Sequence, residues 1–541
     1  MIQLGGLDSL LHLLLMVMLT LVYVRWRSIV ILPAVMLSSL AGVFLGLGVH
    51  PFISGMIEFA VPLLVFVAGL KLKPEFISRE KERVILMGFV EAALFLTFFY
   101  LASSLLPLET ALTLSSLVVA SNEMFAIQAS RFRGGDIGLY GITLSVFEDI
   151  MAVFLLSLGF FTFTAQPTGE ELGFKLAATL SLIPLLYFLS GPFDKLIDRI
   201  ENAESKILLT ILYLAVLVAF SEVPHIPEAL VVFIGAVMLS LRRFDEETFN
   251  AVESYLSLAL IGFVATLPYL PSSSLPESGL NPIPMVLAGF ALALAAFVVR
   301  GVFVFLASLL AGLPLDDCLT LSLALANTGE FGLVVLSYLI GSSELIPPEY
   351  AYTAMFAYAF NLTMVSFIAS RSVEISGWIK ARLGKVTPLL TLLSESGNRF
   401  VNLLAADVKL KKAMVELALI VIIGYSSISL YGLVKVQPIS YVLSLVIVSS
   451  FMSALQKLFQ EFSSELGKSE KIIGVFTGLI KALLLYVIAA PLINFISQGG
   501  GSGGLLYLTS PVNLIIVLAI TYGISKLTSK AVDKLLTRRE M

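Results

Sequence analysis

About seventeen long apolar runs, spread over the whole chain, constrain the fold more than any other feature. Most of them reach or approach the roughly 20 residues that a helix needs to cross a hydrocarbon core about 30 Å thick. Because a bilayer offers no water to backbone amide and carbonyl groups, spanning segments form helices or closed barrels. The sequence predicts an all-α polytopic membrane protein, and 58% hydrophobic against 13% charged residues agree with that class.

The expected spans form two groups, thirteen before residue 371 and four after residue 412. The basic stretch 371–412, which includes Trp378, is predicted to be a cytoplasmic amphipathic linker lying partly on the membrane surface. Residues 1–370 then form one membrane domain and residues 413–541 an additional C-terminal transmembrane domain. The expected spans are 7–24, 29–48, 54–72, 85–106, 111–129, 137–163, 173–190, 207–222, 228–241, 254–270, 283–311, 317–341, 351–370, 414–434, 439–461, 471–496 and 505–526.

Lys and Arg gather in the connections on one side of these spans. The connections on the opposite side contain neither residue: 49–53, 107–110, 164–172, 223–227, 271–282 and 342–350. Basic residues favour the cytoplasmic side of a membrane. We therefore expect a cell-membrane protein with its N-terminus outside and its C-terminus in the cytoplasm.

Composition argues against several other classes. The formal net charge of -4 gives no support to nucleic-acid binding. The single cysteine, Cys318, cannot form an internal disulfide. His12, His50 and His225 are scattered rather than spaced as metal ligands, and we interpret them as residues at span ends. No metal site, no cofactor and no enzymatic activity are predicted, and membrane lipid is the expected environment.

Two adjacent acids, Glu148 and Asp149, stand in a stretch from Gly138 to Phe163 that has no other charged residue. A charge near the bilayer centre costs roughly 2.5–3.5 kcal/mol on insertion scales, so a buried acidic pair indicates a functional site. Neighbouring residues on a helix point about 100° apart, and the two carboxylates cannot face the same partner. We expect them to have different roles.

Two predicted spans contain polar breaks at comparable depth, at 120–123 and at 326–330. Unwound backbone survives in a membrane where protein or a water-filled cavity satisfies it. The breaks lie in segments of opposite orientation, the pattern of inverted repeats around a midplane site. The alternative is that their Ser, Asn and Thr side chains bond to helix carbonyls within ordinary packed helices.

Arg300 is the one charged residue of span 283–311 and lies near its middle. A guanidinium at that depth needs a partner, because it does not readily lose its proton. One carboxylate of the acidic pair can bind Arg300, while the other faces a cavity and alternates between a proton and a cation. The side-chain oxygens of Ser121, Asn122 and Thr328 and backbone carbonyls would complete an oxygen-ligand set.

Several short elements carry a family resemblance over residues 1 to about 370. The string Leu-Ser-Val-Phe-Glu-Asp-Ile at 144–150 resembles the acidic signature of the monovalent cation/proton antiporter superfamily, in its sodium/proton antiporter and potassium efflux branch. Thr-Gly-Glu-Phe-Gly at 328–332 resembles the family's Gly-Glu-Phe element, and Arg300 stands where the family has a basic residue. The segments 68–74 and 114–116 resemble its Gly-Leu-x-Leu and Ser-Ser elements.

The resemblance implies a 13-helix antiporter fold with inverted repeats, two crossed broken helices, a homodimer and elevator-type alternating access. It implies that the movement is centred on Asp149, and we predict that Asp149 carries the ion and the proton while Glu148 forms a mainly structural ion pair with Arg300. Glu123 and Glu330 are possible pathway residues. The chain departs from the family in having Glu-Asp at 148–149 and extra spans in place of a soluble regulatory domain.

The expected function is exchange of Na+ or K+ for H+. Exchange is expected to be electroneutral, because Arg300 cannot release a second proton. The alternatives are a passive monovalent cation channel, a gated potassium efflux pathway and a membrane-embedded enzyme, for which no catalytic constellation is found. Glu91 is expected to reach the cytoplasmic interface, and Lys481 to reach the interface or contact the other domain.

Overall fold

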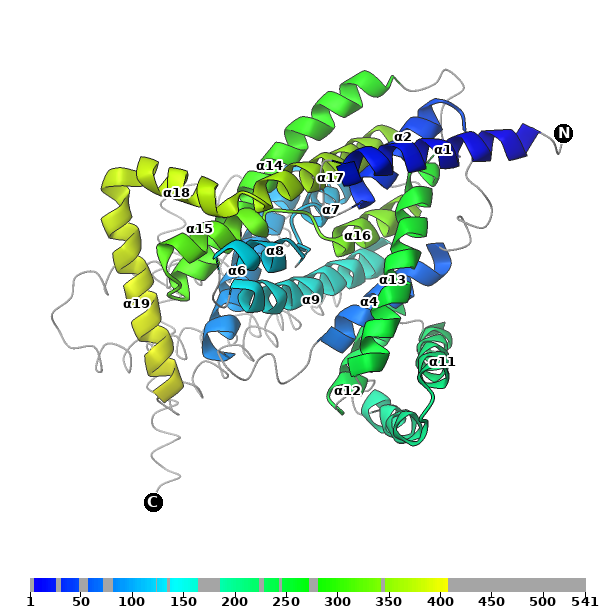
Figure 1. The fold of residues 1–541 in the computed structure, drawn as a ribbon, viewed down its shortest axis with the longest axis horizontal. Helices are drawn as coiled ribbons and strands as arrows, with labels where there is room; N and C mark the ends of the chain where they lie inside the picture. Colours follow the sequence, from blue (N-terminus) through cyan, green and yellow to red (C-terminus); the bar gives the residue numbers. More distant parts are fainter. Residues whose placement is uncertain are drawn as a thin grey trace, which may run out of the picture. The chain divides into compact units, whose positions relative to one another are not determined.

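The structure is a computed structural model, and it describes eleven stretches of the chain (Figure 1). They are residues 4–25, 31–47, 57–71, 81–122, 124–133, 137–163, 185–222, 228–242, 246–271, 281–341 and 346–406. The four predicted C-terminal spans, Lys481, Glu123 and most of the predicted span 173–190 lie outside these stretches.

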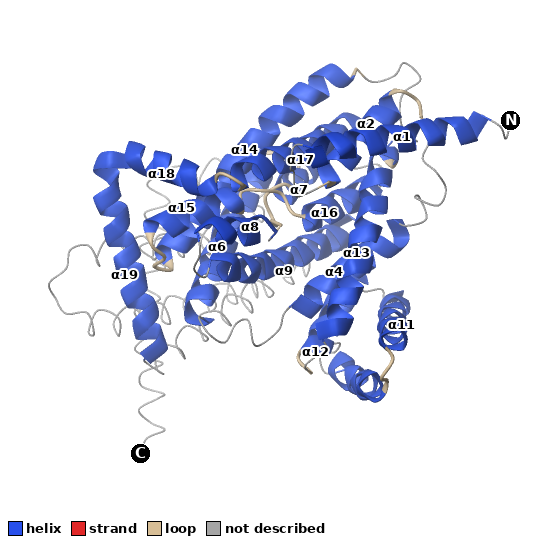
Figure 2. Ribbon diagram, viewed as in Figure 1, coloured by secondary structure: helices blue, strands red, loops and turns tan. Residues whose placement is uncertain are grey.

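Regular secondary structure in the described stretches is helical (Figure 2). An unlabelled helix also covers residues 185–199. The labelled helices are α1 (Leu4–Arg25), α2 (Leu32–Phe44), α4 (Ile57–Lys71), α6 (Lys81–Leu105), α7 (Leu108–Ser116), α8 (Met124–Arg133), α9 (Ile137–Phe163), α11 (Ala203–Glu222), α12 (Glu228–Ser240), α13 (Glu246–Thr266), η1 (Leu267–Tyr269), α14 (Pro282–Leu310), α15 (Leu315–Ala324), α16 (Glu330–Gly341), α17 (Pro348–Ala369), α18 (Ser372–Leu383), η3 (Gly384–Val386) and α19 (Thr387–Ala406).

Four described helices are long and apolar enough to cross a membrane by themselves. They cover Ala203–Ser221, Glu247–Tyr269, Pro282–Leu310 and Pro348–Ala369. Helices α2, α4, α12 and α16 are apolar but shorter. The expected membrane class is confirmed, and the predicted spans that fall in described stretches coincide with these helices to within a few residues at most ends.

The two predicted breaks separate pairs of short helices. The chain leaves helical geometry after α7 and resumes it at α8, and it does the same between α15 and α16. Both breaks are rich in Ser, Asn, Thr or Gly. The polar side chains of Ser, Asn and Thr compete with the helix for backbone hydrogen bonds, and Gly allows backbone conformations that other residues rarely adopt. The expected pair of interrupted helices is confirmed.

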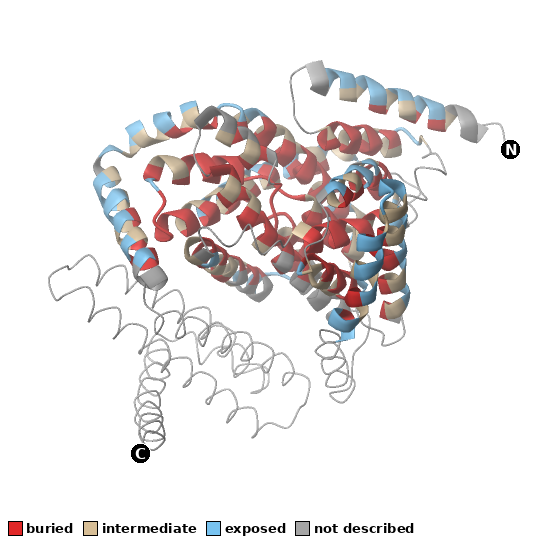
Figure 3. Cartoon of the chain, turned by 60° about the horizontal axis from the view of Figure 1, so that its bottom comes forward, coloured by how far each residue is buried: buried red, intermediate tan, exposed pale blue. Residues whose placement is uncertain are grey.

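Burial differs between the interior of the helix assembly, where buried residues gather, and the outer helices, which also carry exposed residues (Figure 3). Helix α4 packs on α12 and α13, and α9 packs on α6, α8 and α16. By contrast, α1 exposes Leu10, Leu14, Val17, Met18 and Leu21. Exposed apolar side chains on one face of a spanning helix suit contact with lipid.

The sequence interpretation placed His12 at the end of a span, and this prediction was wrong. His12 is fully buried in the interior of α1, and its Nε2 lies 3.2 Å from Ser39 Oγ on α2. Its ring packs against Tyr269 of η1 at a centroid distance of 5.5 Å. This histidine therefore joins α1 to its neighbours.

The chain divides into two compact units, and the predicted linker is shared between them. The first unit includes residues 314–387 and therefore contains α18 and η3, where Lys380 Nζ pairs with Asp316 Oδ1 at 2.9 Å. The second unit contains residues 309–313 and most of α19, where Ser394 Oγ donates to Leu313 O at 2.6 Å. The part of the linker before residue 387 thus packs with the first unit.

Candidate functional site

The two breaks cross with their backbones in direct contact. Gly329 N donates to Ala120 O at 2.7 Å. A Cβ atom on Gly329 would lie 2.6 Å from Ser121 O, and one on Gly332 would lie 2.2 Å from Ser116 O. Because such distances are too short for a side chain, the crossing requires glycine at both positions.

Amide side chains join the two breaks on one side of the crossing. Asn122 N donates to Asn327 Oδ1 at 2.6 Å, and Asn327 Nδ2 donates to Ala324 O at 2.9 Å. Asn122 Nδ2 also donates to Glu330 Oε1 at the start of α16. The backbone of the first break therefore depends on a side chain of the second, and the side chains of Asn122 and Glu330 also join the two breaks.

Thr328 is held by a residue that the sequence interpretation did not single out. Thr328 N donates to Asn361 Oδ1 on α17 at 2.8 Å, and Thr328 Oγ1 donates to Leu117 O at 3.0 Å. Asn361 Nδ2 lies within bonding distance of Ala293 O and Ala326 O. An asparagine in the middle of an apolar span was the available signal for this role.

Arg300 lies at the centre of the buried polar groups and contacts both breaks. Its Nη1 donates to Val118 O, next to the end of α7, at 3.1 Å, and its Nε donates to Leu325 O, next to the end of α15, at 3.3 Å. Its Nη2 pairs with Glu148, and its Nη1 pairs with Glu91 Oε1 at 2.7 Å. The side chains of all three charged residues are 0% exposed.

Glu148 faces the first break as well as the arginine. Its Oε2 accepts from Ser121 N at 2.6 Å and from Ser121 Oγ at 2.5 Å, while its Oε1 pairs with Arg300 Nη2. Ser145, one turn earlier on α9, lies 3.4 Å from Ser121 O. Both oxygens of Glu148 therefore already have donors.

The prediction for Glu91 was wrong. The sequence interpretation placed it at the cytoplasmic interface, but it is fully buried and paired with Arg300. Helix α6 begins at Lys81, so Glu91 lies ten residues into it and about 15 Å along its axis. That depth is too great for the short glutamate side chain to reach the membrane surface.

Asp149 is buried but keeps a small exposed fraction of 7%, whereas Glu148 has none. The adjacent residues thus have different surroundings. Glu330 is half-buried at the first position of α16. Ser121, Asn122 and Thr328, predicted as oxygen ligands, are all buried at the crossing, and Glu123 lies outside the described residues.

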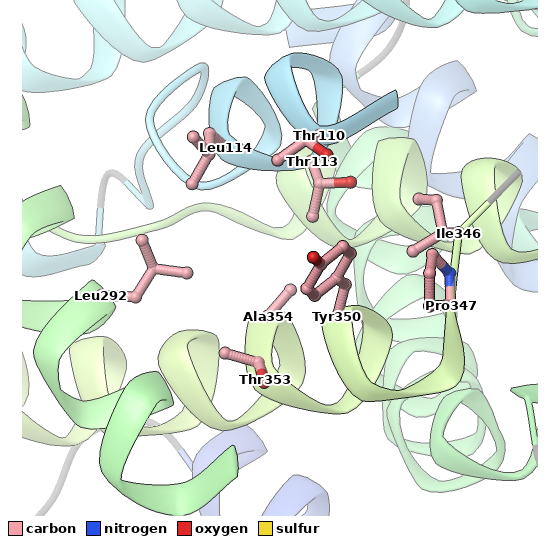
Figure 4. Close-up of a pocket in the computed structure, with 9 residues that line it drawn as sticks. All are labelled: Thr110, Thr113, Leu114, Leu292, Ile346, Pro347, Tyr350, Thr353 and Ala354. Carbon is pink, nitrogen blue, oxygen red and sulfur yellow. The ribbon is translucent and has the colours of Figure 1, made fainter. Parts of the chain in front are cut away.

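A small pocket opens near the crossing but carries no charge. Its volume is about 80 Å³, and Figure 4 shows the ring of Tyr350 among its lining side chains. The lining comes from the start of α7, from α14 and from the start of α17: Thr110, Thr113, Leu114, Leu292, Ile346, Pro347, Tyr350, Thr353 and Ala354. The residues that line this pocket include none of the acidic residues of the crossing.

Two crossed, interrupted helices beside a buried acidic pair, in an all-helical membrane chain, define the class of proteins with an antiporter fold. The family model for the transmembrane region of sodium/hydrogen exchangers matches residues 13–371, which is more than half of the chain. The chain belongs to the sodium/hydrogen exchanger family.

Two individual proteins agree with that membership. A protein named as a K(+) efflux antiporter, KefB, in Alkalimonas amylolytica is 26% identical over 377 residues, which cover 63% of this chain and 55% of the relative. The chain thus spans about half the length of this curated relative. The solved structure of the sodium proton antiporter MjNhaP1 from Methanocaldococcus jannaschii at pH 8 has a TM-score of 0.50 and 17% identity, covering 69% of this chain and 97% of that one.

Proposed function

We propose that this protein exchanges a monovalent cation, Na+ or K+, for H+ across the membrane, with Asp149 as the shared binding group. The observation that carries the proposal is the acidic pair on α9 beside the crossed breaks, in which Glu148 is taken up by Arg300 and Ser121 and Asp149 is the adjacent buried acid. The family membership supports the same function.

Competition at one carboxylate is sufficient for exchange. Burial favours the protonated form of a carboxyl group, and a bound cation favours the charged form. Asp149 would therefore release its proton when the cation binds and take a proton when the cation leaves. Each carrier movement then transports one ligand or the other, as exchange requires.

The remaining ligands of the cation would come from the crossing. Ser121, Asn122 and Thr328 offer side-chain oxygens, and the open breaks offer carbonyl groups. We assign Glu148 to the ion pair with Arg300 rather than to the cation. Glu330, which accepts from Asn122, and Glu123 remain candidates for the pathway.

We further propose that the protein is a homodimer in a cell membrane, with its N-terminus outside and its C-terminus in the cytoplasm. We also propose that it exchanges one cation for one proton.

The transport movement that we propose is of the elevator type. The tight crossing supports this movement, because Gly329 and Gly332 leave no space for the breaks to slide past each other. The close contact therefore favours movement of the two breaks together as one body. A passive channel or gated potassium efflux pathway would instead need a continuous route past Arg300.

The test of the site is Asp149→Asn in the full chain, reconstituted into proteoliposomes. The variant should fold and lose cation-dependent proton movement across a series of alkali ions, because the amide cannot exchange a proton for a cation. Lys380→Ala, in the partly exposed ion pair with Asp316 outside the crossing, is the control and should keep exchange. Near-normal exchange in Asp149→Asn would contradict the assignment.

The stoichiometry is tested with an imposed membrane potential. An inside-negative potassium diffusion potential is set with sodium as the test ion. The potential supplies about 2.3 kcal/mol per net charge per 100 mV, so one-for-one exchange should reverse at the same ion gradient with or without it. A shift of the reversal gradient would show that net charge moves.

A further inference from the structure

The cluster of Glu91, Arg300 and Glu148 contains two carboxyl groups and one guanidinium. Arg300 keeps its charge in proteins. If both carboxyl groups were ionised, the cluster would carry one uncompensated negative charge with all three side chains 0% exposed. Burying an unpaired charge is far more costly than protonating one carboxyl group. Charge balance therefore requires one proton.

The contacts of the two glutamates show which one holds the charge. Glu148 receives Ser121 N–H, Ser121 O–H and Arg300 Nη2. Donors that point at a carboxylate stabilise its charged form. Glu91 pairs with Arg300 Nη1, and among the described residues it accepts no bond from a backbone amide or hydroxyl group. Glu148 thus has donors from Ser121 as well as from Arg300, whereas the arginine is the one donor group described for Glu91.

We propose that Glu91 is a neutral carboxylic acid that keeps its proton throughout the transport cycle and positions Arg300 and Glu148. Its carbonyl oxygen accepts from Arg300 Nη1, and its O–H donates to the carboxylate of Glu148. As a statement about the transport cycle this rests on the proposed function. Glu91 touches neither the cation nor the exchanged proton, so it is a positioning residue.

A resident proton explains how an extra acid is compatible with one-for-one exchange. Helix α6 contributes Glu91, α9 contributes Glu148 and α14 contributes Arg300. A neutral acid bonded to Arg300 helps to join these helices without adding charge to the site. Asp149 then remains the one acid of this neighbourhood that changes occupancy.

The direct test is the infrared spectrum of the full chain in lipid vesicles. A protonated carboxylic acid has a C=O stretching band that carboxylates and amides lack. Glu91→Gln should remove one such band, and the band should persist in the unmodified protein on both sides of neutral pH. Asp149→Asn is the matched control, because the Asp149 band should vary with pH and cation concentration.

Thermal unfolding gives a second readout. Glutamine at position 91 keeps a carbonyl acceptor for Arg300 and an N–H donor for Glu148, so Glu91→Gln should shift the Tm little, and Glu91→Ala should lower it more. Glu148→Gln should lower the Tm by several degrees, because an amide nitrogen replaces an acceptor that faces Ser121 or Arg300. Glutamine should therefore preserve the thermal stability at position 91 but not at position 148.

Two outcomes would overturn the proposal. One is a Glu91→Gln spectrum with no lost carboxylic acid band at any pH, and the other is a Glu91→Gln variant as destabilised as Glu148→Gln. Neither readout requires transport. If Asp149→Asn loses exchange but no carboxylic acid band can be assigned to Glu91, this inference alone is rejected. If the Glu91 band is found but Asp149→Asn exchanges normally, the proposed function alone is rejected.

Discussion

The first break, between α7 and α8, and the second break, between α15 and α16, satisfy their open backbone in different ways. In the first, Ser121 N bonds to the carboxylate of Glu148. In the second, Thr328 N bonds to the neutral amide of Asn361. Arg300 donates to one carbonyl in each. The halves of the crossing share an architecture, but the first one depends on charge.

This difference teaches that similar breaks need not be equally robust. Hydrogen bonds to a charged partner are roughly twice as strong as neutral ones, but they fail together when the charge is lost. The first break combines a charged acceptor with the residues next to Asp149. In the second break the acceptor of Thr328 N is the neutral amide of Asn361, and a change to Asn361 should disturb the site less.

Removal of the shared guanidinium should have the largest effect. Arg300→Ala deletes the donor to both breaks and leaves Glu148 charged and unpaired, which costs roughly 3–5 kcal/mol. Glu148→Ala should also lower stability, and the double variant should lose less than the sum of the two. Thermal unfolding in lipid of the unmodified protein, the two single variants and the double variant measures this coupling. Additive losses would argue that Arg300 and Glu148 contribute no interaction energy as a pair.

A neutral change at the second break should have an intermediate effect. Asn361→Ala leaves Thr328 N without its acceptor, and an unsatisfied buried amide costs about 1–3 kcal/mol. The loss in thermal stability should be smaller than that of Arg300→Ala and independent of whether Glu148 is present. Coupling between Asn361→Ala and Glu148→Ala would show that the two breaks are not separately stabilised.

A pair outside both breaks should have the smallest effect. Lys380 and Asp316 join α18 to α15 at 2.9 Å, with side chains 42% and 34% exposed. Partly exposed pairs contribute about 0–1 kcal/mol. Lys380→Ala should therefore change thermal stability by less than either variant above, and a loss equal to that of Asn361→Ala would assign α18 a larger part in holding the crossing.

The sequence predicted the crossing better than the contacts that hold it. The breaks were recognisable because Ser, Asn, Thr and Gly interrupt otherwise apolar runs, and Arg300 was recognisable because no other charge accompanies it. Glu91 was misjudged because the start of α6 was placed at residue 85 rather than Lys81, and one turn of helix changes depth by about 5.4 Å. Asn361 was missed because a single amide in a span is chemically unremarkable until its partners are known.

The position of Arg300 also bears on where an ion can go. The carbonyl ends of α7 and α15 carry the negative ends of two helix dipoles, and both point at this guanidinium. An incoming cation would otherwise find these carbonyls attractive, but it meets a positive charge that does not dissociate. In the exchange that we propose, the centre of the crossing is thus closed to a cation by repulsion rather than by bulk, and the cation would approach the neighbouring Asp149 on α9 instead.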